Sequence, residues 1–172
     1  GNAKIYEAFS LLSFNKCKNL VVATGENSVA GIITQRELAD AFFTAPGMIE
    51  KEIGHTGSST ALKSLFLRSR KLAVSMILGK ADPTSVSLYL SEADDMIYQR
   101  SLALCLESAG IPPCRFAFIL TGSAGRREPT LLTDQDNAII FENLPGDQSE
   151  RARKYFMNLG KMVNELLSEI GY

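Results

Sequence analysis

The chain has 172 residues, 45% of them hydrophobic and 22% charged, which suits one domain or two small ones and excludes a large multidomain enzyme. Its 18 Lys and Arg against 19 Asp and Glu give a formal net charge of −1, so no overall field attracts the chain to nucleic acid or to an anionic membrane. Cys17, Cys105 and Cys114 are odd in number, far apart and without the spacing of a zinc site, which indicates a reducing compartment. No apolar run suits a membrane span or a signal peptide, so we expect a cytoplasmic protein.

The first forty residues alternate between helical and strand patterns. Apolar runs at 20–23 and 29–33 predict two strands on either side of a turn-rich segment. Thr34 is placed to cap the helix that follows. The helices predicted before and after the strands each have an apolar face, formed by Ile5, Ala8, Phe9 and Leu12 and by Leu38, Ala41 and Phe42. So small a unit buries little surface, and we expect it to need a partner.

A connection rich in Gly, Ser and Thr occupies residues 44–60 and marks the predicted domain boundary, with a short helix around 48–53. Helical periodicity then runs from residue 62 to 77. Asp82 is placed to cap a second long helix, with Pro83 at its first position and Gly110 at its end. Two such helices joined by a short turn predict an antiparallel hairpin.

Strand and helix patterns alternate again after the hairpin. The run 115–120 is apolar on both alternating faces, which predicts a strand covered on both sides. A second strand is predicted at 137–141, followed by a helix whose apolar positions run from Tyr155 to Ile170. We expect a helix-rich α+β protein that divides into 1–46, 47–111 and 112–172.

A glycine turn directly follows the strand at 115–120. Gly122 and Gly125 allow the backbone to approach a phosphate closely, and the amides of the turn and the Ser123 hydroxyl can hold its oxygens. Arg126 and Arg127 add positive charge beside the turn. No Gly-Lys-Ser/Thr sequence follows the glycines, so a P-loop is a poor alternative.

Two carboxylates, Asp134 and Asp136, begin the next predicted strand. Side chains two apart on a strand share a face, roughly 6 to 7 Å apart along the chain, so both can reach one divalent ion. Taken singly, the turn is an ordinary turn and the Asp pair a solvated strand end. Together they match what metal-assisted nucleotidyl transfer requires, namely a grip on a triphosphate and carboxylate-held Mg²⁺ or Mn²⁺.

A resemblance to a known family covers roughly residues 60–172 and is most specific in the segment FAFILTGSAGRREPTLLTDQDNAIIF, residues 116–141. The segment resembles the catalytic core of bacterial signal-transduction proteins that join a pair of cystathionine-β-synthase-type (CBS) domains to a nucleotidyltransferase domain of the DNA polymerase β superfamily. Relatives of that core include the uridylyltransferase of the PII protein and the glutamine synthetase adenylyltransferase. The family's Gly-Ser-x-Gly-Arg-x-Glu element corresponds to residues 122–128, and its Thr-Asp-Gln-Asp element to 133–136.

The resemblance implies that a nucleoside monophosphate passes from a nucleoside triphosphate to a hydroxyl of a protein or a small molecule. Asp134 and Asp136 would hold the metal and act in catalysis. The residues that would bind phosphate are Gly122, Ser123, Gly125, Arg126 and Arg127. The nucleotide is the expected partner, with a protein acceptor as another. The alternative is a module that senses a nucleotide or docks a partner without catalysis.

The first forty residues resemble the later part of a CBS repeat. In members of that family that bind adenosine, a Thr or Ser after the last strand and an Asp three residues later hold the ribose. The corresponding residues here are Thr34 and Glu37, so the sequence departs from the pattern at the second position. The resemblance implies regulation by this unit and a homodimer formed through it.

The superfamily generally places a third metal carboxylate on a later strand. Glu142 lies six residues beyond Asp136, about 20 Å along a strand, and is too distant to join the pair. Either the third carboxylate lies downstream of Tyr172 or the protein lacks one, and we expect little or no turnover from these 172 residues alone.

The remaining polar candidates favour structural roles. His55 is expected to be an exposed loop residue, and the acidic cluster Glu92, Asp94 and Asp95 to be the solvated face of a helix. Glu128 either orients one of the neighbouring arginines or is simply exposed. Tyr155 and Phe156 have the spacing of core residues and need no base-stacking role.

Overall fold

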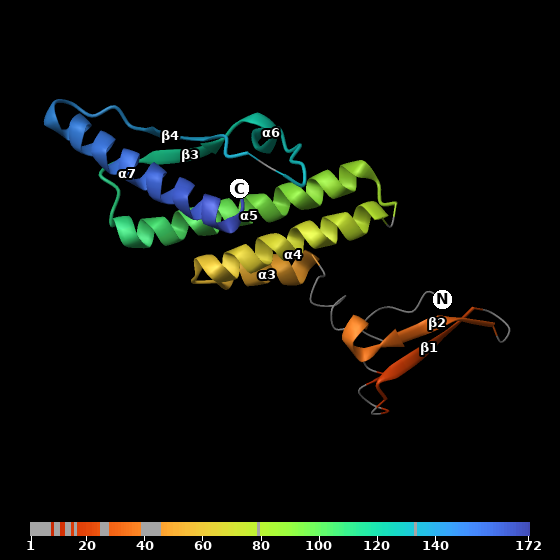
Figure 1. Cartoon of the computed structure of the whole chain (residues 1–172). Helices are drawn as coiled ribbons and strands as arrows, with labels where there is room; N and C mark the ends of the chain where they lie inside the picture. Colours follow the sequence, from red (N-terminus) through yellow and green to blue (C-terminus); the bar gives the residue numbers. More distant parts are fainter. Residues whose placement is uncertain are drawn as a thin grey trace. The chain divides into compact units, whose positions relative to one another are not determined.

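The computed structural model describes residues 8, 11–12, 15, 17–24, 28–38, 46–78, 80–132 and 134–172. The chain separates into two compact units, Gly1–Met48 and Ile49–Tyr172. Each unit contains helical residues and a small antiparallel sheet, so the fold has the helix-rich α+β character that the sequence predicts (Figure 1).

The first unit contains the predicted pair of strands. β1 (Asn19–Thr24) pairs antiparallel with β2 (Ser28–Thr34), with a register shift between Val22 and Ala23. Leu12, in the helical segment before the strands, is buried, as is Leu38 in the helical turn after them. The other predicted helix positions Ile5, Phe9, Ala41 and Phe42 lie outside the described residues.

The predicted helical hairpin is confirmed in the second unit. α3 (Pro46–His55) leads to α4 (Ser59–Leu78) and α5 (Pro83–Ala109), which pack side by side. The Asp82 carboxylate accepts a hydrogen bond from the Ser85 amide at 3.1 Å, the bond expected of a helix N-cap. Gly110, with a φ of 81°, ends α5 as predicted.

The strands and the last helix follow the predicted order. β3 (Phe116–Leu120) leads into the short turn α6 (Gly122–Gly125), and β4 (Asn137–Phe141) pairs antiparallel with β3. α7 (Asp147–Ile170) packs against α4 and α5 (Figure 1). The helices therefore form a support on which the two-stranded sheet lies.

Only one face of this sheet is covered, so the prediction of a strand buried on both sides is wrong for the described residues. Phe116, Phe118 and Leu120 face a cluster built mainly from α7, whereas Ala117 and its cross-strand neighbour Ile140 are exposed. Alternate residues of a strand point to opposite faces, and the helices of this unit lie against only one of them. Apolar residues on both faces of a strand show that each face could be buried, but they do not show that another helix or sheet packs on each face.

Apolar side chains from all four long elements meet at the centre of the second unit. One cluster comprises Ile49, Ile53, Leu62, Leu65, Phe66, Ile97 and Ile170. A second joins the sheet to α5 and α7 and contains Tyr98, Cys105, Ala152, Phe156, Leu159, Val163 and Leu167. The core thus fixes α5 and the sheet relative to each other, which positions the segment between β3 and β4.

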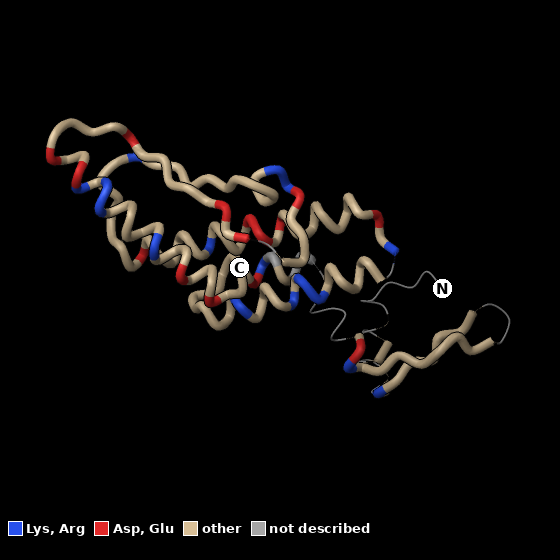
Figure 2. Tube along the Cα trace, turned by 45° about the horizontal axis from the view of Figure 1, so that its top comes forward, with Lys and Arg blue, Asp and Glu red and all other residues tan. Residues whose placement is uncertain are grey.

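Charged residues of both signs are mixed along the helices (Figure 2). Cys17, Cys105 and Cys114 are free thiols. Over the part of the chain that the structure describes, no helix combines the length and the apolar character needed to cross a bilayer.

Candidate active site

The sheet brings the glycine turn and the Asp pair together at one end. Leu120 at the end of β3 is the cross-strand partner of Asn137 at the start of β4, so Thr121 lies beside Asp136. The Thr121 amide donates a hydrogen bond to the Asp136 carbonyl at 2.8 Å, and its hydroxyl donates to the same oxygen at 3.2 Å. The turn and the segment that carries Asp136 are therefore held together through the backbone.

Gly122 and Gly125 both occupy positions that exclude a side chain. Gly122 has a φ of +58°, and a Cβ built on it would lie 2.0 Å from Asp136 Oδ2. A Cβ on Gly125 would lie 2.6 Å from the Leu120 carbonyl oxygen. The first glycine leaves room for the Asp136 carboxylate, and the second allows the turn to fold back on the strand before it.

The glycine turn is closed by backbone hydrogen bonds. The amides of Gly125, Arg126 and Arg127 donate to the carbonyls of Thr121, Gly122 and Ala124, at 2.9, 3.3 and 3.0 Å. The amides that begin a helical turn have no partner within it. Those of residues 122–124, together with the Ser123 hydroxyl, are the donors that a phosphate would meet at this turn.

Asp134 and Asp136 are both exposed, and Gln135 between them turns toward α7. The side-chain Nε2 of Gln135 donates to the carbonyls of Asn164 at 3.3 Å and Tyr172 at 3.5 Å. The Asp136 carboxylate lies beside the glycine turn, where a Cβ on Gly122 would meet it. β4 begins at Asn137, so both lie in the segment that leads into the strand.

No group of three or more His, Cys, Asp or Glu side chains within the described ranges could hold a metal ion. Glu142 pairs instead with Arg115 at 2.5 Å, at the other end of the sheet. Hydrogen bonds from the Arg115 side chain and amide lower the pKa of the Glu142 carboxyl. These findings agree with the expectation that Glu142 does not join the Asp pair.

The two arginines after the turn have different partners. Arg126 Nε lies 3.3 Å from the Glu128 carboxylate, and both side chains are mostly exposed. Arg127 instead reaches α5, where its guanidinium lies 2.8 Å from Asp95 Oδ2. That hydrogen bond raises the pKa of Arg127. Of the two readings of Glu128, the structure favours the one in which it pairs with Arg126.

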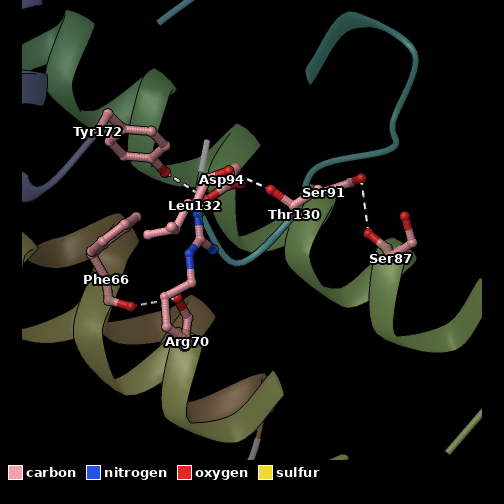
Figure 3. Close-up of polar contacts among 9 residues, drawn as sticks. Phe66, Arg70, Ser87, Ser91, Asp94, Thr130, Leu132 and Tyr172 are labelled. Atoms are coloured by element: carbon pink, nitrogen blue, oxygen red, sulfur yellow. Dashed lines mark hydrogen bonds and ion pairs between the residues drawn. The ribbon is translucent and has the colours of Figure 1, made fainter. Parts of the chain in front are cut away.

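Sequence reasoning missed the contribution of α5, because it assigned the acidic cluster to a solvated face. Glu92 is exposed, but Asp94 is only 2% exposed. Asp94 Oδ1 accepts hydrogen bonds from Arg70 at 2.7 Å and from the Tyr172 hydroxyl at 2.6 Å (Figure 3). Burial raises the pKa of the Asp94 carboxyl, although Arg70 and Tyr172 act in the opposite direction.

A signal for this role was present in the sequence. Asp94 lies close to Ala93 and Ile97, which belong to the buried apolar face of α5. Arg70 likewise lies among the buried apolar positions of α4. The guanidinium of Arg70 also lies 4.3 Å from the ring centroid of Phe66. Arg70 and Asp94 therefore lie in the same buried layer, where their opposite charges form an ion pair.

The expectations about other single residues are met in part, since His55 is exposed as predicted but not in a loop. His55 is exposed and bonds to the Lys51 carbonyl at the end of α3, so it ends a helix rather than lying in a loop. Phe156 is buried in the core as predicted. Tyr155 is partly buried and donates to the Gly110 carbonyl at 2.6 Å.

In the first unit, Thr34 and Glu37 bond to each other. Glu37 Oε2 accepts from the Thr34 amide at 2.7 Å, and the Thr34 hydroxyl accepts from the Glu37 amide at 3.1 Å. This reciprocal pair is a capping box at the start of the helix after β2. A pocket of about 470 Å³ adjoins it, lined by Lys18, Asn19, Thr34, Gln35 and Arg36.

A second pocket, of about 560 Å³, lies between the α4–α5 turn and residues 129–132. Its lining is mainly apolar and includes neither Asp134 nor Asp136. The pocket therefore lies beside the segment that joins the glycine turn to the Asp pair, and does not contain the site itself.

Comparison with protein families gives one match. The model of a family described as Putative nucleotidyltransferase DUF294 matches residues 68–172, more than half of the chain. The match includes α5, the glycine turn and the Asp pair. No curated protein and no solved structure matches the chain significantly.

Proposed function

Because the chain belongs to the family Putative nucleotidyltransferase DUF294, we propose that the protein transfers a nucleoside monophosphate from a nucleoside triphosphate to a hydroxyl of a protein or a small molecule. The observation that carries this proposal is the contact between Gly122 and Asp136, since it joins a phosphate-binding turn to a carboxylate suited to a metal. The acceptor oxygen would form a bond to the α-phosphorus as the bond to pyrophosphate breaks.

The donor set at the turn fits a magnesium or manganese ion. Asp134 and Asp136 offer exposed carboxylate oxygens, the hard ligands that such ions prefer, and water and the phosphates of the nucleotide complete the usual set. When bound, the ion would supply charge stabilisation for the attacking and leaving oxygens. Asp136 is held through its backbone by Thr121, so its carboxylate stays beside the turn.

The chain's own residues bind and orient the triphosphate in this proposal. Gly122 and Gly125 allow the backbone to approach its oxygens, and the Ser123 hydroxyl and the first amides of the turn donate hydrogen bonds to them. Arg126 supplies a positive charge, since its contact with Glu128 is long and exposed and is easily exchanged for phosphate.

The experiment that tests this proposal replaces both carboxylates, as Asp134→Asn with Asp136→Asn. The double variant is expected to keep its circular dichroism spectrum but to lose Mg²⁺-dependent binding of labelled nucleoside triphosphates and any transfer to an acceptor. The matched control is Glu150→Gln with Glu165→Gln, which removes two exposed carboxylates of α7. Unchanged nucleotide binding in the Asp134 and Asp136 double variant would sink the assignment.

The alternative function is a module that senses a nucleotide or docks a partner without catalysis, and that uses the same glycine turn to bind the phosphates. The two functions differ in the products of a long incubation with nucleoside triphosphate, Mg²⁺ and candidate acceptors. The transferase releases pyrophosphate, whereas the sensor binds the nucleotide and leaves it intact.

The first unit enters this proposal as a CBS-like regulatory segment. Val21 and its cross-strand neighbour Ile32 are more than 60% exposed, an apolar surface that a second copy of the chain could cover in a homodimer. The pocket beside Thr34 and Glu37 would receive an adenosine nucleotide, with Lys18 and Arg36 near its phosphates. Titration with ATP of the wild type and of Thr34→Ala tests that site.

A further inference from the structure

We propose that Asp95 and Ser87 of α5 are positioning residues for the phosphate-binding turn, and that Arg127 acts through them rather than as a phosphate ligand. The inference rests on the proposed function, because it assigns a role within the same site. It concerns the residues that connect the helical hairpin to residues 122–128, and it changes the role that the sequence predicts for Arg127.

Arg127 is attached to α5 at two points. Its guanidinium donates a hydrogen bond to Asp95 Oδ2 at 2.8 Å, and its carbonyl oxygen accepts one from the Ser87 hydroxyl at 3.3 Å. The backbone of Arg127 has a φ of +59°, a left-handed conformation that residues other than glycine rarely adopt. Such a conformation persists where surrounding contacts fix it, and these two contacts both come from α5.

The segment held in this way includes the turn itself. The Arg127 amide donates to the Ala124 carbonyl at 3.0 Å, and the Glu128 amide donates to the Ser123 carbonyl at 2.9 Å. Ser123 and Ala124 are residues whose amides would face a phosphate. A shift of Arg127 would therefore be passed directly to the donors of the turn.

The part of α5 that contacts Arg127 is held in place by further hydrogen bonds. Asp95 follows Asp94, whose buried carboxylate is fixed by Arg70 of α4 and by the hydroxyl of Tyr172 (Figure 3). The Ser87 carbonyl accepts a hydrogen bond from the Ser91 hydroxyl at 2.9 Å within α5. The two neighbouring aspartates therefore have different roles. Asp94 connects α5 to α4 and to Tyr172, and Asp95 connects α5 to the glycine turn through Arg127.

Two variants and a base-free probe test the proposal. The probe is tripolyphosphate with Mg²⁺, which has the phosphate chain without a nucleoside, and its binding is measured by titration calorimetry. Asp95→Ala is expected to weaken binding about threefold to tenfold, the range expected for a largely exposed ion pair that orders a loop. Arg127→Ala should weaken it to the same degree, and Asp95→Glu should restore most of it.

The double variant Asp95→Ala with Arg127→Ala distinguishes positioning from direct binding. If Arg127 acts only through Asp95, the double variant binds no more weakly than either single variant. If Arg127 is a phosphate ligand that Asp95 holds back, Asp95→Ala binds more tightly than the wild type, and that result overturns the proposal. The control is Glu107→Ala, which removes an exposed carboxylate at the far end of the same helix.

Hydrogen exchange of the amides of residues 122–128 gives a readout that does not depend on ligand binding. Faster exchange there in Asp95→Ala and Ser87→Ala, with no change in Glu107→Ala, supports the positioning role even if the wild type fails to bind Mg²⁺-tripolyphosphate. That failure would count against the proposed function alone. Unchanged exchange in both α5 variants would overturn the positioning role.

Discussion

The Cα of Gly122 lies against the carboxylate of Asp136, so close that a Cβ on residue 122 would be 2.0 Å from Asp136 Oδ2. These residues belong to the two halves of the candidate site, the glycine turn proposed to bind phosphate and the Asp pair proposed to hold a metal ion. Their contact follows from the antiparallel pairing of β3 with β4, which ends at Leu120 and Asn137. A change at either residue is therefore expected to disturb both halves.

Gly122→Ala is predicted to reduce binding of Mg²⁺-tripolyphosphate at least tenfold, because the new methyl group must displace the Asp136 carboxylate. The left-handed φ adds a cost of about 1–2 kcal/mol in folding stability. The matched control is Gly146→Ala, since Gly146 has a similar φ of +54° but no neighbour within 4 Å of the added Cβ. Calorimetric titration and urea unfolding separate the two effects: both variants lose stability, and only Gly122→Ala loses binding.

Arg70→Met is predicted to destabilise the fold by about 3–5 kcal/mol, because it leaves the buried Asp94 carboxylate without its opposite charge. Met keeps an unbranched apolar side chain at this position but removes the guanidinium that lies over the Phe66 ring. The measurement is the free energy of unfolding from urea denaturation at neutral pH.

The control for this prediction is Arg68→Met, two residues earlier on α4. Arg68 lies 2.6 Å from Glu52, but both side chains are partly exposed, so the expected cost is at most about 1 kcal/mol. Equal losses in the two variants would show that the burial of the Arg70–Asp94 pair carries no special weight.

Tyr98 is predicted to titrate far above a free tyrosine. Burial, followed by the nearby Asp94 charge, raises the pKa of its phenol to about 12 from 10. A raised pKa means that the folded state keeps a proton that the unfolded state has lost, so stability from this group is present below pH 10 and declines as pH rises toward 12. Absorbance at 295 nm during an alkaline titration should show that Tyr98→Phe lacks a phenolate that forms near pH 12 in the wild type.

Leu159→Ala is predicted to cost about 2–5 kcal/mol, since Leu159 is fully buried where α7 meets α5 and the sheet. Met157→Ala, two residues earlier on α7, removes a side chain that is 66% exposed and should change stability by no more than about 0.5 kcal/mol. Thermal unfolding of both variants measures the difference. A similar loss in the two would contradict the orientation of α7.

Much of the secondary structure could be predicted from local patterns. The cap at Asp82 and Pro83, the glycine that ends α5 and the apolar period of α7 are each decided by residues within one or two turns, and the structure agrees at all three. The glycine turn and the Asp pair were also recognisable from the sequence, because each is a short local motif.

Contacts between distant segments could not be read in this way. Asp94 and Asp95 are neighbours on one helix, yet one is buried against Arg70 and Tyr172 and the other reaches Arg127. Which side of α5 is solvated depends on where α4, α7 and the turn after β3 pack, and those partners lie 24 to 78 residues away in the chain. The acidic residues of α5 do not by themselves indicate how these distant segments pack.

By itself, the sequence determined the order of the elements and the helix ends, and it marked the glycine turn and the Asp pair as candidate phosphate and metal ligands, because capping, periodicity and turn chemistry act over a few residues. Only the tertiary structure decided that one face of the sheet is covered, that Gly122 makes room for Asp136, and that Arg127 is held by α5. These relationships depend on burial and on distances between segments, and both exist only once the helices and the sheet have packed together.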